Sequence, residues 1–197
     1  MSSKSQTTRR RILAVGRRLL EQRGFHGVGL DEVARAAGVS RQAVYLHFRS
    51  KTGLLLEMVD YVFATEVPPA LMARWKDAAT GRQALKTAIA IHASYEPRVY
   101  RFGRVLHAAR REEPAAAAAW NNRMAARRAN YKKVAEWLAR DGDLLESWSV
   151  PEAADLLWAL TSFHMFEYLV VEAGWSTRRY AKDIRIVLER ALLKPAR

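Results

Sequence analysis

The most informative spacing of polar side chains in this chain falls in the stretch SRQAVYLHFRSK. If this stretch is helical, at 100° per residue, Val44 and Phe48 project together from one side, and Gln42 and Leu46 project from the opposite side. The amide of Gln42 can form two hydrogen bonds with the edge of adenine, while Ala43 and Leu46 can touch thymine methyl groups. The chemistry available to this face is therefore hydrogen bonding and apolar contact with base edges.

Cationic and hydroxyl-bearing side chains flank that face. The residues placed to bind phosphate groups on either side of it are Arg41, Tyr45, His47 and Lys51. A helix that starts at Ser50 and Lys51 also presents free backbone N–H groups to a phosphate. A small helical hairpin with polar surface residues can show the same pattern by chance, so the pattern alone leaves a purely structural interpretation open.

Two short helices must hold these side chains in place. Periodicity predicts helices over residues 30–37 and 40–48, joined by a tight turn in which Gly38 takes the positive φ that the turn needs. The small residue Ala34 lets the two helices cross closely. The apolar residues that would pack this pair against a first helix, predicted from residue 7 or 8 to residue 23, are Val33, Ala37, Val39, Val44 and Phe48. These are the proportions of a helix-turn-helix.

Residues 24–55, GFHGVGLDEVARAAGVSRQAVYLHFRSKTGLL, resemble the DNA-binding head of the TetR (tetracycline-repressor-type) family of transcriptional regulators. The most specific elements are GF, VA, AGVS and above all YLHFRSK, which begins at Tyr45. The resemblance covers about residues 8–60 and implies a dimeric regulator whose third helix binds a palindromic operator. It also implies DNA contacts at the matching positions, which are Ser40, Arg41, Gln42, Ala43, Tyr45, His47 and Lys51.

Two residues depart from the family's pattern. Gly29 stands where the family usually has a Ser or Thr that caps the second helix and touches a phosphate, so we expect that contact to be lost. Gly53 stands where an acidic residue often completes the cap of the fourth helix, so we expect the first turn of that helix to be looser.

Charge and composition point to an anionic partner. The chain has 197 residues with 33 Lys and Arg against 20 Asp and Glu, and its formal net charge is +13. The first 60 residues carry 11 of the basic and 5 of the acidic side chains, so this part is about twice as basic per residue as the rest. Nucleic acid fits that distribution, and a solvated basic surface is the alternative. The absence of Cys excludes disulfides, thiolate metal sites and a Cys nucleophile.

The remaining sequence predicts an all-α protein of about nine helices, with a three-helix helix-turn-helix head and a C-terminal bundle that binds a ligand and dimerises. Ser50 caps a fourth helix that ends at Pro68-Pro69, which divides the chain into domains of residues 1–67 and 68–197. Further helices are expected over residues 81–94, 99–113, 114–140, 150–173 and from residue 177, with Pro97 separating the first two. The longest stretch without a formal charge, residues 156–166, is too short to span a membrane, so we expect a cytosolic protein.

The helix after Pro151 is apolar nearly all round and must be covered on both faces. Together with the last helix it could form half of a two-fold, four-helix dimer interface. A central helix in a monomeric bundle would show the same composition. In the TetR family the last two long helices commonly make the dimer contact, so the resemblance favours a homodimer.

Aromatic and polar residues mix in the middle helices and could line a pocket for an apolar or aromatic small molecule. The candidate ligand-binding residues are Tyr95, Phe102, His107, Trp120, Asn121, Trp137, Phe163 and His164. An aromatic stripe at helical spacing also serves as plain core. Arg98, Arg101 and Arg104 lie at i, i+3 and i+6 and could hold an anionic effector or form a solvated face.

Enzyme chemistry finds no support in the sequence. The pairs His164/Glu167 and His107 with Glu112 lack the order and number of ligands that helical metal-carboxylate sites use. A Gly-rich phosphate loop and a Ser nucleophile elbow are absent. We expect no catalytic residue, cofactor or metal, and a repressor that binds operator DNA as a homodimer and is released by a small molecule. The rival hypothesis is a structural protein that coats DNA without reading its sequence.

Overall fold

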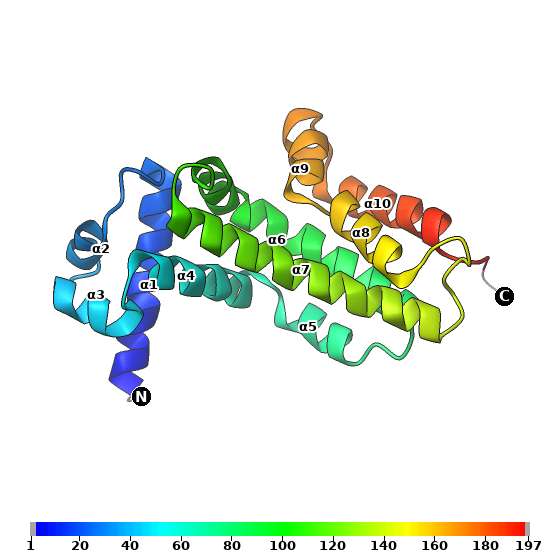
Figure 1. Ribbon diagram of the computed structural model, residues 1–197, viewed down its shortest axis with the longest axis horizontal. Helices are drawn as coiled ribbons and strands as arrows, with labels where there is room; N and C mark the ends of the chain where they lie inside the picture. The colour runs from blue at the N-terminus through cyan, green and yellow to red at the C-terminus, as the bar shows by residue number, and fades with distance from the viewer. Residues whose placement is uncertain (1–2, 196–197) are drawn as a thin grey trace. The chain divides into compact units, whose positions relative to one another are not determined.

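The computed structural model describes residues 3–195, and the elements in that range are helical. The helices are α1 (Ser3–Arg23), α2 (Leu30–Ala36), α3 (Arg41–Phe48), α4 (Lys51–Glu66), α5 (Pro69–Lys76), α6 (Gly81–Ala109), α7 (Pro114–Arg140), α8 (Val150–Leu160), α9 (Phe163–Phe166), the π-helical η1 (Glu167–Glu172) and α10 (Thr177–Leu192) (Figure 1). An isolated bridge joins Leu144 and Leu193, and the described range contains no strand. The predicted all-α fold class is confirmed.

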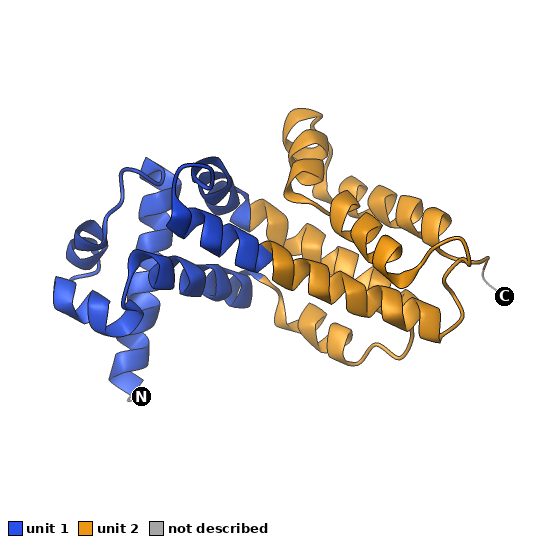
Figure 2. Cartoon of the chain, in the orientation of Figure 1, with its two compact units in different colours: residues 1–66, 99–123 blue, residues 67–98, 124–197 orange. Residues whose placement is uncertain are grey.

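The chain forms two compact units, drawn in blue and orange in Figure 2. Unit 1 contains residues 1–66 and 99–123, and unit 2 contains residues 67–98 and 124–197. The long helices α6 and α7 therefore each contribute residues to both units. The division into domains of residues 1–67 and 68–197 stays a prediction.

The core of unit 1 holds the helix-turn-helix together. Helix α1 packs against α2 and α4, and α2 packs against α3. The buried residues of this core include Ile12 and Leu20 of α1, Val33 of α2, Val44 and Phe48 of α3, Leu55 and Met58 of α4, Phe102 and Leu106 of α6, and Ala116 and Ala119 of α7. Burial of these side chains positions α3, because an eight-residue helix is too short to be stable by itself.

Unit 2 is organised by capped helices with apolar stripes. Ser149 caps α8 and Ser176 caps α10, where each hydroxyl accepts a hydrogen bond from a backbone N–H three residues later. The residues that α10 buries are Tyr180, Ile184, Leu188 and Leu192, which lie four positions apart on one side of the helix. Helices α8 and α10 pack against each other.

Two expectations about where helices break were wrong. Pro97 lies inside the continuous helix α6 instead of ending one, because apolar residues on both sides of it are buried and offset the cost of about 3 kcal/mol. The helix expected over residues 150–173 breaks after Leu160, since the Thr161 hydroxyl donates to the carbonyl of Leu157 and the Ser162 hydroxyl caps α9.

The short helix α5 was not predicted at all; it starts at a proline, which suits the first helical turn. Helix α1 begins at Ser3, earlier than expected, so it carries additional N-terminal turns. Within the described range, no helix is long and apolar enough to cross a membrane.

Candidate functional site

The turn between α2 and α3 has the predicted glycine geometry. Gly38 has a φ of +62°, and Val39 N–H donates to the carbonyl of Ala34 at 3.0 Å. The Ser40 hydroxyl then accepts a hydrogen bond from Ala43 N–H at 3.1 Å and caps α3. A serine hydroxyl in this position satisfies one of the donors that a helix start leaves free. The local sequence thus sets both the end of α2 and the start of α3.

Helix α3 turns one side inward and the other outward, as its periodicity predicts. Val44 and Phe48 are buried at 0% and 3% exposure, whereas Leu46 is 79% exposed. Gln42 is also exposed and lies on the same side as Leu46. An exposed leucine next to an exposed amide is a surface that can contact a thymine methyl group and an adenine edge.

The predicted phosphate-binding residues lie at both ends of α3. Arg41 is paired with Asp31 at 3.0 Å, and its guanidinium lies 5.5 Å from the centre of the exposed Tyr45 ring. The Lys51 ammonium lies 4.0 Å from the centre of the Phe25 ring, in cation–π contact. These contacts limit the rotamers that the two cations adopt. His47 is half-buried, and Ala43 is partly covered as well.

The corner between α3 and α4 depends on a close backbone approach. Arg49 has a φ of +61°, and the Ser50 hydroxyl accepts a hydrogen bond from Gly53 N–H at 3.0 Å. A Cβ at residue 53 would lie 2.2 Å from the carbonyl oxygen of Phe48. Gly53 is therefore required by the packing of α4 against the end of α3, and the first turn of α4 is capped by Ser50.

Gly29 is the other residue that departs from the family pattern, and no side chain caps α2 there. Instead the Gly29 N–H donates to the Glu32 carboxylate at 3.2 Å. A Cβ at Gly29 would meet no atom within 4 Å, and its φ of −99° suits any residue. A Ser or Thr side chain would therefore fit at residue 29. Its absence changes the chemistry of an exposed helix start and is not explained by lack of space.

The N-terminal end of α1 adds cations that the sequence reasoning did not assign. Arg9 forms an ion pair with Glu57 and donates to the carbonyl of His47 at 3.3 Å, which ties α1 to the end of α3. Lys4, Arg10 and Arg11 are exposed on the same turns. The run of three arginines was a visible signal, but only the contact of Arg9 with the His47 carbonyl shows that the run starts beside α3.

The candidate ligand-binding residues divide between the two units. In unit 1, the rings of His107 and Trp120 lie 4.8 Å apart, Phe102 is core and Asn121 is exposed. In unit 2, the members are Tyr95, Trp137, Phe163 and His164. Tyr95 packs edge-on against His92, Phe163 is buried and His164 is exposed. Trp137 stacks on Trp75 of α5 at 5.7 Å, an arrangement that its place in the sequence did not indicate.

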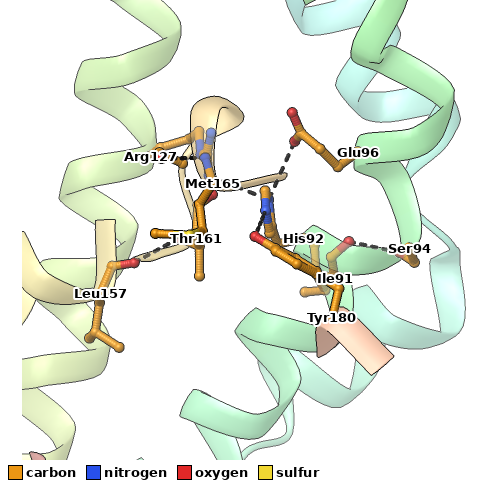
Figure 3. A network of polar contacts seen from close by, with 10 residues as sticks. Ile91, His92, Ser94, Glu96, Arg127, Leu157, Thr161, Met165 and Tyr180 are labelled. Atoms are coloured by element: carbon orange, nitrogen blue, oxygen red, sulfur yellow. Dashed lines mark hydrogen bonds and ion pairs between the residues drawn. The ribbon is translucent and has the colours of Figure 1, made fainter. Parts of the chain in front are cut away.

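Unit 2 also buries a polar network that sequence reasoning missed (Figure 3). His92 and Glu96 of α6 and Arg127 of α7 are at most 5% exposed. The Arg127 guanidinium donates to the carbonyl of Thr161 and lies 3.3 Å from Nδ1 of His92. The same nitrogen lies 3.3 Å from the Glu96 carboxylate, and Nε2 of His92 lies 3.0 Å from the Tyr180 hydroxyl.

Electrostatics favour the charged form of Arg127 despite its burial. Burial opposes the charge, but the oxygens of Tyr95 and Tyr131 and the Glu96 carboxylate outweigh it and raise the pKa of the guanidinium. Burial also raises the pKa of Tyr180, so its hydroxyl stays neutral. The network thus joins a buried cation and carboxylate across α6, α7, α10 and the break after α8.

Comparisons with known proteins match both the head and the whole fold. The model of bacterial regulatory proteins of the tetR family matches residues 12–58. The transcriptional regulator AcrR of Shigella flexneri is 46% identical over 54 residues, which are 27% of this chain and 25% of AcrR. The chain therefore aligns with only about a quarter of the length of that curated relative.

Two solved structures resemble the chain over nearly its full length. NalD, the secondary repressor of the MexAB-OprM multidrug efflux pump in Pseudomonas aeruginosa, has a TM-score of 0.74 at 24% identity and covers 98% of this chain and 99% of its own. A transcriptional regulator from Saccharomonospora viridis, solved in complex with choline, has a TM-score of 0.73 at 20% identity and covers 96% and 99%. Residues 12–58 therefore match the model of the tetR family, and the chain as a whole shares the fold of these two solved structures.

Proposed function

We propose that the protein is a homodimeric transcriptional repressor that inserts α3 into the major groove of a palindromic operator and is released by a small-molecule effector. The observation that carries this proposal is the outward face of α3, where Gln42 and the 79% exposed Leu46 lie opposite the buried Val44 and Phe48. A helix held rigidly by its inner side and bearing base-reading groups on its outer side suits sequence recognition.

Phosphate contacts would come from three places around that helix. Arg41 and Tyr45 lie on one flank, and Ser50 and Lys51 lie at the start of α4, a position that suits a bound phosphate. The basic turns of α1 form the third place. They precede residue 12, where the match to the family model begins, and span about 13 Å at 1.5 Å per residue.

The dimer would form through α8 and α10. In the single chain Leu156, Trp158 and Leu160 of α8 remain partly exposed, and Val187 of α10 is 49% exposed. Tyr168 of η1 also exposes more than half of its surface. Apolar side chains of this size on two adjacent helices are suited to an isologous interface.

Leu160→Glu tests the interface. We expect a folded monomer with weak operator binding, because each head alone reads a half-site. Circular dichroism must show intact helicity beside sedimentation, since an unpaired charge would also unfold a monomeric core. A wild-type chain that sediments as a monomer at micromolar concentration refutes the dimer.

The effector would be apolar or aromatic and, within unit 1, would contact His107 and Trp120, whose rings lie 4.8 Å apart. The choline complex of the Saccharomonospora viridis regulator shows that a protein of this fold can hold a small molecule. The mechanism would be a population shift, in which the effector prefers a conformation whose heads no longer fit successive major grooves. Helices α6 and α7 carry residues of both units and would transmit that preference.

Effector binding can be followed by fluorescence, because all six tryptophans lie after residue 74. Trp120→Ala and His107→Ala should reduce the response to an effector and leave effector-free DNA binding intact. If compounds that release the operator act normally on both variants, the effector binds elsewhere.

A gel shift with competitor DNA separates the repressor from a protein that coats DNA. A sequence-reading regulator should favour its operator by about 10³ or more over random duplex. The operator is sought first in the DNA adjoining the gene, and selection from random duplex gives the same information. Equal affinity for selected and random duplex would overturn the proposal in favour of the coating protein.

A further inference from the structure

A groove in unit 1 is lined by none of the proposed DNA contacts, and its lining includes Arg104, one of the three arginines considered above for an anionic effector. It has a volume of about 420 Å³ and lies between the α1–α2 loop and the last two turns of α6. Its lining residues are Gly24, Phe25 and His26 of the loop and Arg104, Val105, Ala108 and Ala109 of α6. We name it the Arg104 groove. Its volume falls in the range of about 300–1,000 Å³ that small-molecule sites occupy.

The lining combines one cation with apolar surface. Val105 and Ala109 lie at i and i+4 on α6, and the rings of Phe25 and His26 meet edge to face at 6.0 Å. Arg104 is exposed, and no carboxylate among residues 3–195 lies within ion-pair distance of its guanidinium. A guanidinium beside an apolar wall matches a ligand with a carboxylate at one end and an apolar body.

The carboxylates nearest the groove are engaged by His26. Its Nδ1 lies 3.3 Å from Glu113, and its Nε2 lies 3.8 Å from Glu112, just beyond the end of α6. These contacts hold the loop against the α6–α7 connection. Among the lining residues, Arg104 carries the permanent positive charge that an entering anion would meet.

The Phe25 side chain connects the groove to the proposed DNA interface. Phe25 lines the groove and also carries the Lys51 ammonium at 4.0 Å from its ring centre. The Phe25 ring is 3% exposed, so any ligand that packs against it must share it with Lys51. A small displacement of this ring would change where Lys51 is held.

We infer that the Arg104 groove binds a small carboxylate with an apolar body, and that its occupancy weakens operator binding by moving Phe25 and with it Lys51. The binding site stands on the lining residues alone. The effect on DNA rests on the proposed function, so the two are tested separately.

Benzoate is the probe for the site, with neutral benzamide as its uncharged counterpart. On the DNA-free protein we expect benzoate to bind with a Kd of about 1 mM, as suits so small a molecule, and benzamide at least tenfold more weakly. Isothermal titration and ¹H–¹⁵N spectra measure both, and the shifted amides should include Phe25 and Ala108. Equal binding of the two compounds would overturn the assignment.

Two variants and one control locate the site. Arg104→Gln removes the charge and Ala108→Leu fills the groove while keeping the charge, and each should weaken benzoate binding at least tenfold. Arg101→Gln, an exposed arginine one turn earlier on α6 that does not line the groove, should bind benzoate within twofold of the wild type. Unchanged binding in Arg104→Gln, or equal loss in Arg101→Gln, would refute the site.

Operator binding then tests the coupling. Saturating benzoate should weaken wild-type binding to selected operator severalfold, and by linkage operator DNA should weaken benzoate binding by the same factor. The Arg104→Gln variant should bind operator as tightly as the wild type without benzoate, and added benzoate should leave its operator affinity unchanged. Benzoate that binds the groove but leaves operator affinity unchanged would overturn the coupling, whereas absence of any operator binding would instead refute the proposed function.

Discussion

Removing the buried cation of unit 2 should cost far more stability than removing its neighbour on the same helix. Arg127→Met keeps an unbranched apolar stem but deletes the hydrogen bond to the Thr161 carbonyl and the cation that faces Glu96. A buried carboxylate without its partner costs about 3–5 kcal/mol. For a chain of this size we expect the Tm to fall by about 6–20 °C.

The matched control is the next residue along α7. Arg128 pairs with Asp155 at 2.6 Å, but its side chain is 60% exposed. Solvent screens such a pair, so Arg128→Met should lower the free energy of unfolding by no more than about 1 kcal/mol. Urea unfolding followed by circular dichroism, at one fixed protein concentration because dimerisation affects stability, compares the two variants.

The double variant Arg127→Met/Glu96→Gln identifies the cause of the loss. Replacing both charges should restore at least half of the stability, because the desolvated carboxylate is then gone. In Arg127→Met alone, the Glu96 carboxyl still faces the His92 ring but has lost the nearby cation, so it should bind a proton in the folded state more readily than in the unfolded state. Folding then takes up a proton, so the deficit should be smaller at pH 5 than at pH 8. Equal losses in Arg127→Met and Arg128→Met, or no recovery in the double variant, would refute this reasoning.

The remaining predictions concern the head. Gly53→Ala should lower the free energy of unfolding by about 1–3 kcal/mol, because the added Cβ would meet the last carbonyl of α3. Gly29→Ala should change the free energy of unfolding by less than about 1 kcal/mol, and urea unfolding compares the two variants. Gln42→Ala should cost about 1–3 kcal/mol on the operator and almost nothing on random duplex; equal losses in a gel shift would exclude it as a base reader. Lys51→Ala should weaken binding to all DNA alike and lower the slope of log K against log salt by about one per subunit, and an unchanged slope would contradict a phosphate contact.

Local chemistry was readable from the sequence. The turn at Gly38, the cap at Ser50 and the inward side of α3 at Val44 and Phe48 all follow from residues within a few positions of one another. Helix periodicity and capping depend on such neighbours, so a single sequence predicts them. The same reasoning identified the all-α class and the segment that carries the family resemblance.

Other features depend on residues far apart in the chain, and only the tertiary structure decided them. Pro97 was expected to end a helix, yet packing on both sides keeps α6 continuous. Gly53 was interpreted as a loosened cap, but it marks where α4 meets the end of α3. His92 and Arg127 carried no local signal of their meeting. Burial and pairing of such groups are set by which distant side chains come within a few ångströms, and spacing along a sequence does not encode that.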